Sequence, residues 1–401
     1  MQSAIAALAA VLIGTTAGTF SVAAADKVKE FRGAWVSTVF NIDWPSKPGL
    51  SSAGQKAELL AILDRAKELQ LTAILLQVRP ASDALYASKI EPWSAFLAGT
   101  QGTDANYDPL AFAVREAHAR GLELHAWINP FRAATNTTGP FALNHITQTH
   151  PDWIRKEGKL LWTDPGVPAA REHVLRVVLD IVHRYAVDGV HIDDYFYPYP
   201  TKGGKDFDDE RSWTQYGVPS GKSRADWRRD NINQFIEQLY TRVKAERSSV
   251  KVGISPFGIY RPHVPATIEA GVDAYASLYC DAKLWLARGW CDYLAPQLYW
   301  SIDPPAQSFP VLLNWWREQS TMGRPIWPGL ASTRIGEKRS AREIADQIAL
   351  TRKGTTSPGH IHWNMKSLMQ NRGGIADLLK ANVYGTGTAS NATLKQTGVA
   401  Q

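Results

Sequence analysis

Two adjacent aspartates, Asp193 and Asp194, are the residues whose types and spacing point most clearly to chemistry. They follow the apolar, β-branched segment 189–192 and precede the aromatic residues of 195–197. This pattern is typical of a buried strand that gives way to a loop. In the structural alternative, one aspartate caps a turn and the other is solvated; for a lone aspartate this interpretation would be favoured. Burying two like charges is unfavourable, so the pair beside aromatic rings favours a sugar-cleaving site.

The segments that must position this pair alternate between strand and helix along the whole chain. Strands are predicted over residues 31–40, 71–79, 122–129, 189–195, 250–258, 292–300, 325–331 and 360–365. Helices are predicted over residues 55–69, 109–120, 169–185, 225–247, 281–289, 309–321, 341–353 and 374–381. Eight strand–helix units favour a closed parallel barrel over an open sheet. The predicted fold class is therefore α/β, a TIM (β/α)8 barrel.

The connections in this pattern are strongly unequal in length. Helix-to-strand connections are short, such as Gln70 alone or Gly121 alone. Strand-to-helix connections are long, and the four longest cover residues 80–107, 130–168, 196–224 and 259–280. The long loops are therefore expected at the C-terminal face of the barrel, where barrel enzymes carry their active sites.

Polar and aromatic side chains are concentrated where the predicted strands end. The predicted substrate-binding residues among them are Asp43, Gln77, Arg79, Asn129, Arg132, Tyr195, Gln297, Tyr299, Trp300 and Asn364. Amides and arginines beside aromatic planes suit sugars, which offer hydroxyl groups at the rim of the ring and C–H groups on its faces. Taken singly, Gln77 and Asn129 could instead satisfy loop backbone, and Trp300 could belong to the core of a lid.

Composition and charge limit the class of protein. The chain has 401 residues, of which 44% are hydrophobic and 20% charged, as in a globular protein. Its net charge of +6 comes from scattered residues without a Lys/Arg block, which argues against nucleic-acid binding. Residues 1–25 are predicted to be a signal peptide, 26–384 the barrel, and 385–401 a disordered tail. We expect an exported, periplasmic or extracellular monomer without stable membrane insertion.

The two cysteines, Cys280 and Cys291, are predicted to be free buried thiols. The predicted helix between them separates its ends by about 13 Å. Disulfide-bonded Cα atoms lie within about 7 Å of each other.

No metal or cofactor is predicted. The histidines show no spacing such as His-Glu-x-x-His. The chain also lacks a glycine-rich phosphate loop and the sequence context of a serine or cysteine nucleophile.

Several long motifs occur in a characteristic order. They are RGAWV at 32–36, QVRP at 77–80, DALY at 83–86, EPWS at 91–94, HAWINPFR at 125–132, WTDPG at 162–166, ISPFG at 254–258 and APQLYW at 295–300. Through them and the Asp-Asp strand, the chain resembles the bacterial glycosyl-hydrolase-like family 10 proteins over nearly all of residues 31–380. The resemblance implies an exported TIM-barrel hydrolase. Characterised relatives act on peptidoglycan glycan strands from which the stem peptides have been removed.

Neighbouring aspartates cannot easily lie on opposite faces of one sugar, as the usual two-carboxylate mechanism requires. They suit substrate-assisted hydrolysis, in which the 2-acetamido group of the sugar attacks its own anomeric carbon. We expect Asp193 to orient that group and Asp194 to be the general acid, with the order open, and Tyr299 to bind the acetamido oxygen. Residues 188–193 are similar to the chitinase strand, but Tyr195 stands where chitinases place their acid glutamate.

Two alternatives stay open at this point. One pairs either aspartate with Glu91 or Asp43, both counted among the substrate-binding residues, in a two-carboxylate mechanism. The other is a barrel that binds cell-wall glycan without cleaving it. A polysaccharide deacetylase is less favoured, because no metal-ligand set is visible.

Overall fold

A computed structural model of the chain describes residues 29–200, 203–337 and 339–385. The predicted signal peptide, and all of the predicted tail except Gly385, lie outside the described residues. Within the described part, no helix combines the length and apolar character needed to cross a bilayer.

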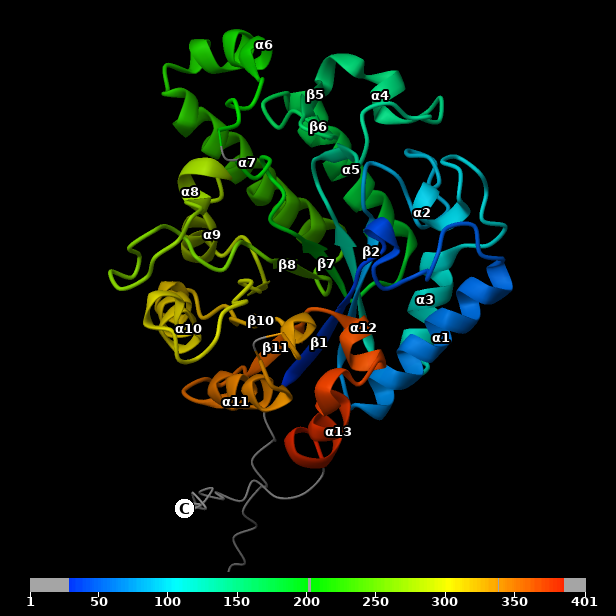
Figure 1. The fold of residues 1–401 in the computed structure, drawn as a ribbon. Helices are drawn as coiled ribbons and strands as arrows, with labels where there is room; N and C mark the ends of the chain where they lie inside the picture. The colour runs from blue at the N-terminus through cyan, green and yellow to red at the C-terminus, as the bar shows by residue number, and fades with distance from the viewer. Residues whose placement is uncertain (1–28, 201–202, 338, 386–401) are drawn as a thin grey trace, which may run out of the picture.

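The described chain is organised around one eight-stranded parallel sheet (Figure 1). Its strands are β1 (Phe31–Val36), β2 (Ala73–Arg79), β3 (Glu123–Ile128), β7 (Gly189–Ile192), β8 (Lys251–Ile254), β9 (Tyr293–Leu294), β10 (Gly329–Leu330) and β11 (Gly359–His362). The order is β10-β11-β1-β2-β3-β7-β8-β9. Parallel bridges from Leu294 to Ile326 and from Gln297 to Gly329 join the two ends of this order. The predicted TIM barrel is confirmed.

Helices cover the outside of the barrel, as expected for strands that are buried on both faces (Figure 1). They are α1 (Ser52–Glu68), α3 (Pro109–His118), α5 (Pro168–Arg184), α7 (Arg224–Glu246), α9 (Ala282–Arg288), α10 (Phe309–Gln319), α11 (Ala341–Arg352), α12 (Met365–Met369) and α13 (Ile375–Leu378). Asp108 caps α3 by accepting a hydrogen bond from Ala111 N, with Pro109 in the first turn. Cys280 and Cys291, which flank α9, are free and buried, as predicted.

Aromatic rings fill the inside of the barrel, and small residues make room for them. A Cβ at Gly253 would lie 1.9 Å from the Tyr293 ring, and one at Gly189 would lie 2.6 Å from the His125 ring. Side chains at these two positions would therefore expel the rings. The interior cluster is Phe31, Trp35, Ala73, Leu75, Trp127, Tyr293, Ala295, Trp327 and Ile361.

The first strand is shorter than predicted, since β1 ends at Val36 rather than at residue 40. Gln77 takes the backbone N–H groups that would extend the ladder: its Oε1 accepts from Thr38 N at 3.0 Å and from Val39 N at 2.9 Å. Phe40 then adopts a left-handed conformation, with φ 55° and ψ 18°, which no strand can continue.

The strands predicted over 292–300 and 325–331 are also shorter, at two residues each in β9 and β10. Pro296, Pro325 and Pro328 lack the N–H group that a continuous ladder needs. The two segments still pair through the backbone groups that remain: Gly329 N donates a hydrogen bond to Pro296 O at 2.9 Å.

The segment 130–168, predicted to be a long loop, folds into a small antiparallel sheet. Its strands are β4 (Arg132–Ala134), β5 (Ile154–Glu157) and β6 (Leu160–Thr163), in the order β4-β6-β5. Gly158, with φ 57°, lies in the two-residue turn that joins β5 to β6. In Figure 1 this sheet stands with α4 (Ile146–Thr149) and α6 (Glu210–Ser212) at the top of the barrel. Further short helices in the loops are α2 (Ala95–Ala98) and α8 (Ala274–Ser277).

Candidate active site

A cavity of about 250 Å³ opens at the C-terminal mouth of the barrel. It is lined by Trp35, Trp127, Asp193, Asp194, Tyr195, Tyr199, Ser255, Gln297, Tyr299 and Trp363. Five of the predicted site residues thus meet in one place: both aspartates, Tyr195, Gln297 and Tyr299. The lining comes from the ends of β1, β3, β7, β8, β9 and β11, so the barrel brings together residues that are far apart in the chain.

Asp193 is buried and held by nitrogen donors from β3 and the loop after it. Its Oδ2 accepts a hydrogen bond from Trp127 Nε1 at 3.0 Å and another from Asn129 Nδ2 at 3.0 Å. Burial raises the pKa of the Asp193 carboxyl to about 7, and the charge of Asp194 adds to this. The charge of Arg132 and the two hydrogen-bond donors act in the opposite direction.

Asp194 is equally buried but bonds toward the other side of the cavity. Its Oδ2 accepts a hydrogen bond from the hydroxyl of Tyr199. Burial raises the pKa of the Asp194 carboxyl, while hydrogen bonds from Tyr199 and Gln297 partly counteract the rise. Raised pKa values make it easier for one of the two carboxyl groups to keep its proton while the other is ionised. The site can therefore offer an acid and a carboxylate at the same time.

Asn129 and Arg132 fix the loop that faces Asp193. The Oδ1 of Asn129 accepts from Arg132 N at 2.8 Å, which aims its amide nitrogen at the aspartate. The Arg132 guanidinium lies over the Tyr195 ring, 4.4 Å from the ring centre. Neither Asn129 nor Arg132 is among the residues that line the cavity, and the contacts of both position residues that do.

Arg79 and Glu91 form a fully buried ion pair beneath this loop. Arg79 Nε donates to Glu91 Oε2 at 2.8 Å, and Arg79 NH2 donates to Oε1 at 2.6 Å. Arg79 NH1 also donates to the backbone oxygens of Asn129 at 2.6 Å and Pro130 at 3.0 Å. Burial alone would raise the pKa of Glu91, but the charge of Arg79 and a hydrogen bond with His173 lower it to about 2. The structure places this pair behind the site.

Four other predicted site residues also lie outside the cavity lining. Gln77 binds the loop after β1, as described above. Asp43 accepts from Asn364 Nδ2 at 3.2 Å and from Lys366 N at 2.7 Å, and burial raises its pKa to about 6. Trp300 packs edge-on against Phe257, with ring centres 5.6 Å apart. Gln77, Asp43 and Asn364 thus join neighbouring loops of the barrel mouth to one another.

Tyr299 brings a phenol into the cavity beside the aspartates. Burial raises its pKa well above the ordinary value, and the charge of Asp194 adds to this. The Tyr299 hydroxyl therefore keeps its proton and can donate a hydrogen bond. Gln297, two residues earlier, donates to Ser255 O at 3.2 Å and is held against β8 by that bond.

The predicted set of site residues left out five lining residues: Trp35, Trp127, Trp363, Tyr199 and Ser255. The three indoles pack edge-on, with Trp363 lying 6.1 Å from Trp35 and 6.0 Å from Trp127 between ring centres. Trp35 and Trp127 are strand residues, and their place beside strand exits was an available signal. The sequence does not show whether these side chains point into the barrel, because a tryptophan in a strand can equally pack under the outer helices.

A buried hydrogen-bond chain sets the orientation of the Trp35 ring. Trp35 Nε1 donates to His191 Nε2 at 3.1 Å, so the proton of that imidazole lies on Nδ1. His191 Nδ1 contacts the Tyr293 hydroxyl at 3.0 Å, and this hydroxyl contacts His125 Nδ1 at 2.8 Å. Burial lowers the pKa of His191 well below its ordinary value, so the ring stays neutral and Trp35 keeps its acceptor.

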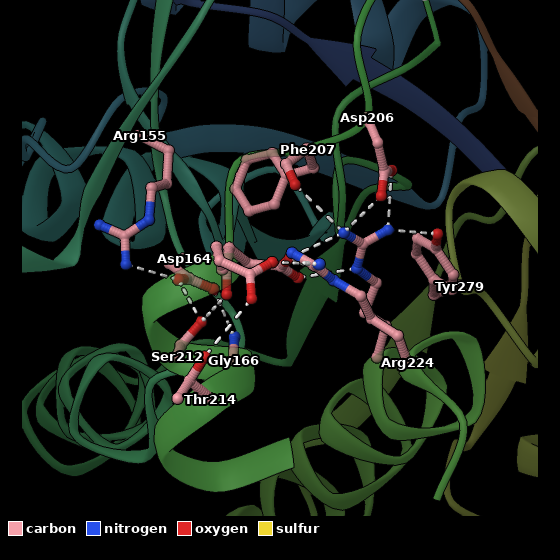
Figure 2. A network of polar contacts seen from close by, with 12 residues as sticks. Arg155, Asp164, Gly166, Asp206, Phe207, Ser212, Thr214, Arg224 and Tyr279 are labelled. Carbon is pink, nitrogen blue, oxygen red and sulfur yellow. Dashed lines mark hydrogen bonds and ion pairs between the residues drawn. The ribbon is translucent and has the colours of Figure 1, made fainter. Parts of the chain in front are cut away.

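A network of ion pairs ties the loop after β7 to the small sheet (Figure 2). Asp164 accepts from Arg155 NH2 at 2.8 Å and from the hydroxyl of Ser212 at 2.7 Å. On the other side, the buried Arg228 of α7 donates to Asp206 and to the buried Asp209. Tyr199, which binds Asp194, belongs to the same loop as Asp206. The network therefore supports the wall of the cavity that Tyr199 forms.

Among the residues that the structure describes, no three His, Cys, Asp or Glu side chains are grouped so that they could hold a metal ion. Of the cavity-lining residues in this part of the chain, only Asp193 and Asp194 carry carboxyl groups.

Comparison with known proteins gives both family and structural matches. The family model described as "Glycosyl hydrolase-like 10" matches residues 30–344. "Glycosyl hydrolase YngK" of Bacillus subtilis (strain 168) is 39% identical over 391 residues, which cover 93% of this chain and 76% of that protein. "Glycosyl hydrolase DigH" of Escherichia coli (strain K12) is 35% identical over 328 residues, which cover 76% of this chain and 74% of that protein.

Two solved structures show the same fold. The glycoside hydrolase domain of PgaB (BpsB) from Bordetella bronchiseptica matches with a TM-score of 0.59 at 14% identity, covering 90% of this chain and 100% of that one. The catalytic domain of a β-amylase from Paenibacillus polymyxa matches with a TM-score of 0.55 at 9% identity, covering 88% of this chain and 97% of that one. At such identities the likeness concerns the fold alone.

Proposed function

The chain belongs to the glycosyl hydrolase-like 10 family, and from that premise we propose that it is a glycoside hydrolase of 2-acetamido-sugar polysaccharides. Its proposed substrate is the glycan strand of peptidoglycan after removal of the stem peptides. Such a substrate is exposed in the periplasm or outside the cell, which is where we place the protein. Relatives that carry the name glycosyl hydrolase support the reaction class.

The observation that carries the proposal is the adjacent carboxyl pair at the floor of a small, indole-walled cavity. Asp193 and Asp194 both have raised pKa values there. The apolar faces of the three indoles suit the methyl group of an acetamido substituent, and Tyr299 supplies a protonated hydroxyl for its oxygen. A cavity of about 250 Å³ admits one sugar residue at its floor.

In the proposed mechanism the sugar supplies its own nucleophile. The acetamido oxygen attacks the anomeric carbon while the glycosidic C–O bond breaks, and the Asp194 proton passes to the leaving oxygen. The Asp193 carboxylate accepts a hydrogen bond from the acetamido N–H and stabilises the positive charge that develops on this group. Water then attacks the anomeric carbon and opens the five-membered ring that the acetamido group had formed with it. Asp194 takes back a proton from the attacking water. The product keeps the anomeric configuration.

The contacts of Glu91 and Asp43 weigh against the two-carboxylate alternative. Glu91 is committed to Arg79, and its low pKa makes it a poor proton donor. Asp43 is committed to three donors from two loops, at Ser37, Asn364 and Lys366. Both lie outside the cavity lining, whereas Asp193 and Asp194 lie within it.

Digestion of peptide-free peptidoglycan strands by the purified protein tests the function. We expect new reducing ends by mass spectrometry, with fragment lengths that separate internal from terminal cleavage. Products with an anhydro end would instead indicate a lyase, and strands bound without any turnover would indicate a binding barrel. Strands with the 2-acetamido group deacetylated are expected to resist cleavage, because they lack the nucleophile. Efficient cleavage of the deacetylated strands would favour a two-carboxylate mechanism.

The pH dependence of cleavage distinguishes the roles of the two aspartates. If Asp193 acts as the carboxylate, activity falls as pH drops through its pKa of about 7. The Trp127 N–H bond favours the ionised form, so Trp127→Phe raises the pKa of Asp193 and moves the acid limb of the kcat profile to higher pH. The profile of Tyr240→Phe, a change on the outer helix α7, serves as the control. A shift of the alkaline limb in Trp127→Phe would assign the acid role to Asp193.

A further inference from the structure

Phe40 is an aromatic side chain that the fold presents to solvent. The residue is 61% exposed, although most aromatic residues in the described part of the chain are buried or half-buried. It lies in the loop after β1, the strand that carries Trp35 into the cavity. Phe40 therefore stands on the face of the barrel that contains the candidate active site.

The backbone at Phe40 is strained to reach this position. Phe40 and Asn41 have φ angles of 55° and 52°, in the left-handed region that bulky side chains avoid. A residue selected only for stability at such a position is glycine or asparagine. Asn41 fits that expectation, whereas Phe40 does not.

Hydrogen bonds on both sides of Phe40 impose the conformation. On one side, Gln77 accepts from Thr38 N and Val39 N. On the other, Asn41 Nδ2 donates to Pro45 O at 2.9 Å and to Phe96 O at 2.8 Å. The surrounding structure thus holds a conformation that Phe40 itself disfavours, which is the situation in which backbone strain points to function.

A second aromatic ring supports the exposed one. The ring of Phe96, from α2 in the loop after β2, meets the Phe40 ring edge-on with centres 5.7 Å apart. Phe40 remains 61% exposed despite this contact, so much of its ring is available to solvent. An exposed aromatic face of fixed orientation suits the C–H face of a sugar ring.

We propose that Phe40, supported by Phe96, is a stacking subsite for a sugar ring of a long glycan strand, separate from the cavity in which the bond is cleaved. The inference rests on the proposed function, because the ligand is the same strand. It predicts that long strands gain affinity from Phe40, whereas a fragment that fills only the cavity does not.

The test compares Phe40→Gly and Phe40→Asn with two controls. Phe40→Tyr keeps the ring, and Met322→Ala removes a side chain of similar exposure, 57%, from the loop between α10 and β10 at the opposite end of the barrel. Affinity for long peptide-free strands and for a single 2-acetamido sugar, the ligand that the cavity admits, is measured by titration calorimetry in the Asp194→Asn background. Urea unfolding of each variant is measured in parallel.

We expect Phe40→Gly and Phe40→Asn to bind long strands about tenfold more weakly and the single sugar with unchanged affinity. The urea midpoint should stay equal or rise, because both residues accept the left-handed conformation. Both controls should bind as the parent does. Equal affinity of Phe40→Gly and the parent for long strands would overturn the inference. Binding that depends on Phe40, in a wild-type protein that cleaves nothing, would support the subsite and reject the hydrolase.

Discussion

Replacing Asp194 with asparagine is expected to lower kcat on peptide-free strands by about 10²–10⁴-fold, the usual contribution of a general acid. Asp193→Asn should cause a loss of similar size, because an amide cannot stabilise the charge on the acetamido group. Neither change should unfold the protein, since each replaces a buried carboxyl group, whose ionisation burial disfavours, with a neutral amide of similar shape. Release of reducing ends and the urea midpoint of each variant are the measurements.

A substrate with an activated leaving group separates the two variants. Such a leaving group departs without protonation, so Asp194→Asn should recover much of its activity on an aryl glycoside of the acetamido sugar, and Asp193→Asn should not. Recovery by Asp193→Asn alone would show that Asp193 is the general acid and that Asp194 orients the acetamido group. Asp43→Asn is the matched carboxyl control outside the cavity. Loss of turnover in this variant, with the Asp194 variant fully active, would refute the paired mechanism.

Removing the guanidinium of Arg79 is expected to have the largest effect on stability. Arg79→Met leaves Glu91 buried without its main partner and takes the donor from the backbone oxygens of Asn129 and Pro130. Breaking a buried pair in this way typically lowers the free energy of unfolding by about 3–5 kcal/mol. Turnover should fall as well, because Asn129 would no longer be held against Asp193.

The pH dependence of that loss has a definite sign. In the wild type the pKa of Glu91 is depressed to about 2, so its ion pair stabilises the fold above the ordinary glutamate pKa. This contribution disappears as pH falls toward 2. In Arg79→Met the unpaired Glu91 is disfavoured most when it is ionised, so the difference in stability from wild type should shrink in acid.

Two variants control the Arg79 result. Arg65→Met removes an exposed i,i+3 pair with Glu68 on α1 and should change the free energy of unfolding by less than about 1 kcal/mol. Arg79→Met combined with Glu91→Leu removes both charges and should recover part of the loss. A double variant as unstable as the sum of the two single changes would show that the pair itself contributes little.

The alternation of strands and helices, and hence the barrel, could be predicted from the sequence alone. The signals are local: runs of apolar residues, Asp108 before Pro109 at a helix start, and glycines after helices. The Asp193–Asp194 pair could be predicted for the same reason, because a buried strand leads directly into it. Its place in the cavity follows from the rule that strand ends meet at one face of a barrel.

Only the tertiary structure decided which polar residues face the cavity. Arg79 and Glu91 lie on strand and loop as expected, yet they bond to each other behind the site. Asp43 accepts a hydrogen bond from Asn364, which is 321 positions away in the sequence. Conversely, Trp127 lies inside the barrel and donates to Asp193, 66 positions away. Side-chain direction beyond a strand end depends on loop torsions and on distant partners, and neither leaves a local mark in the sequence.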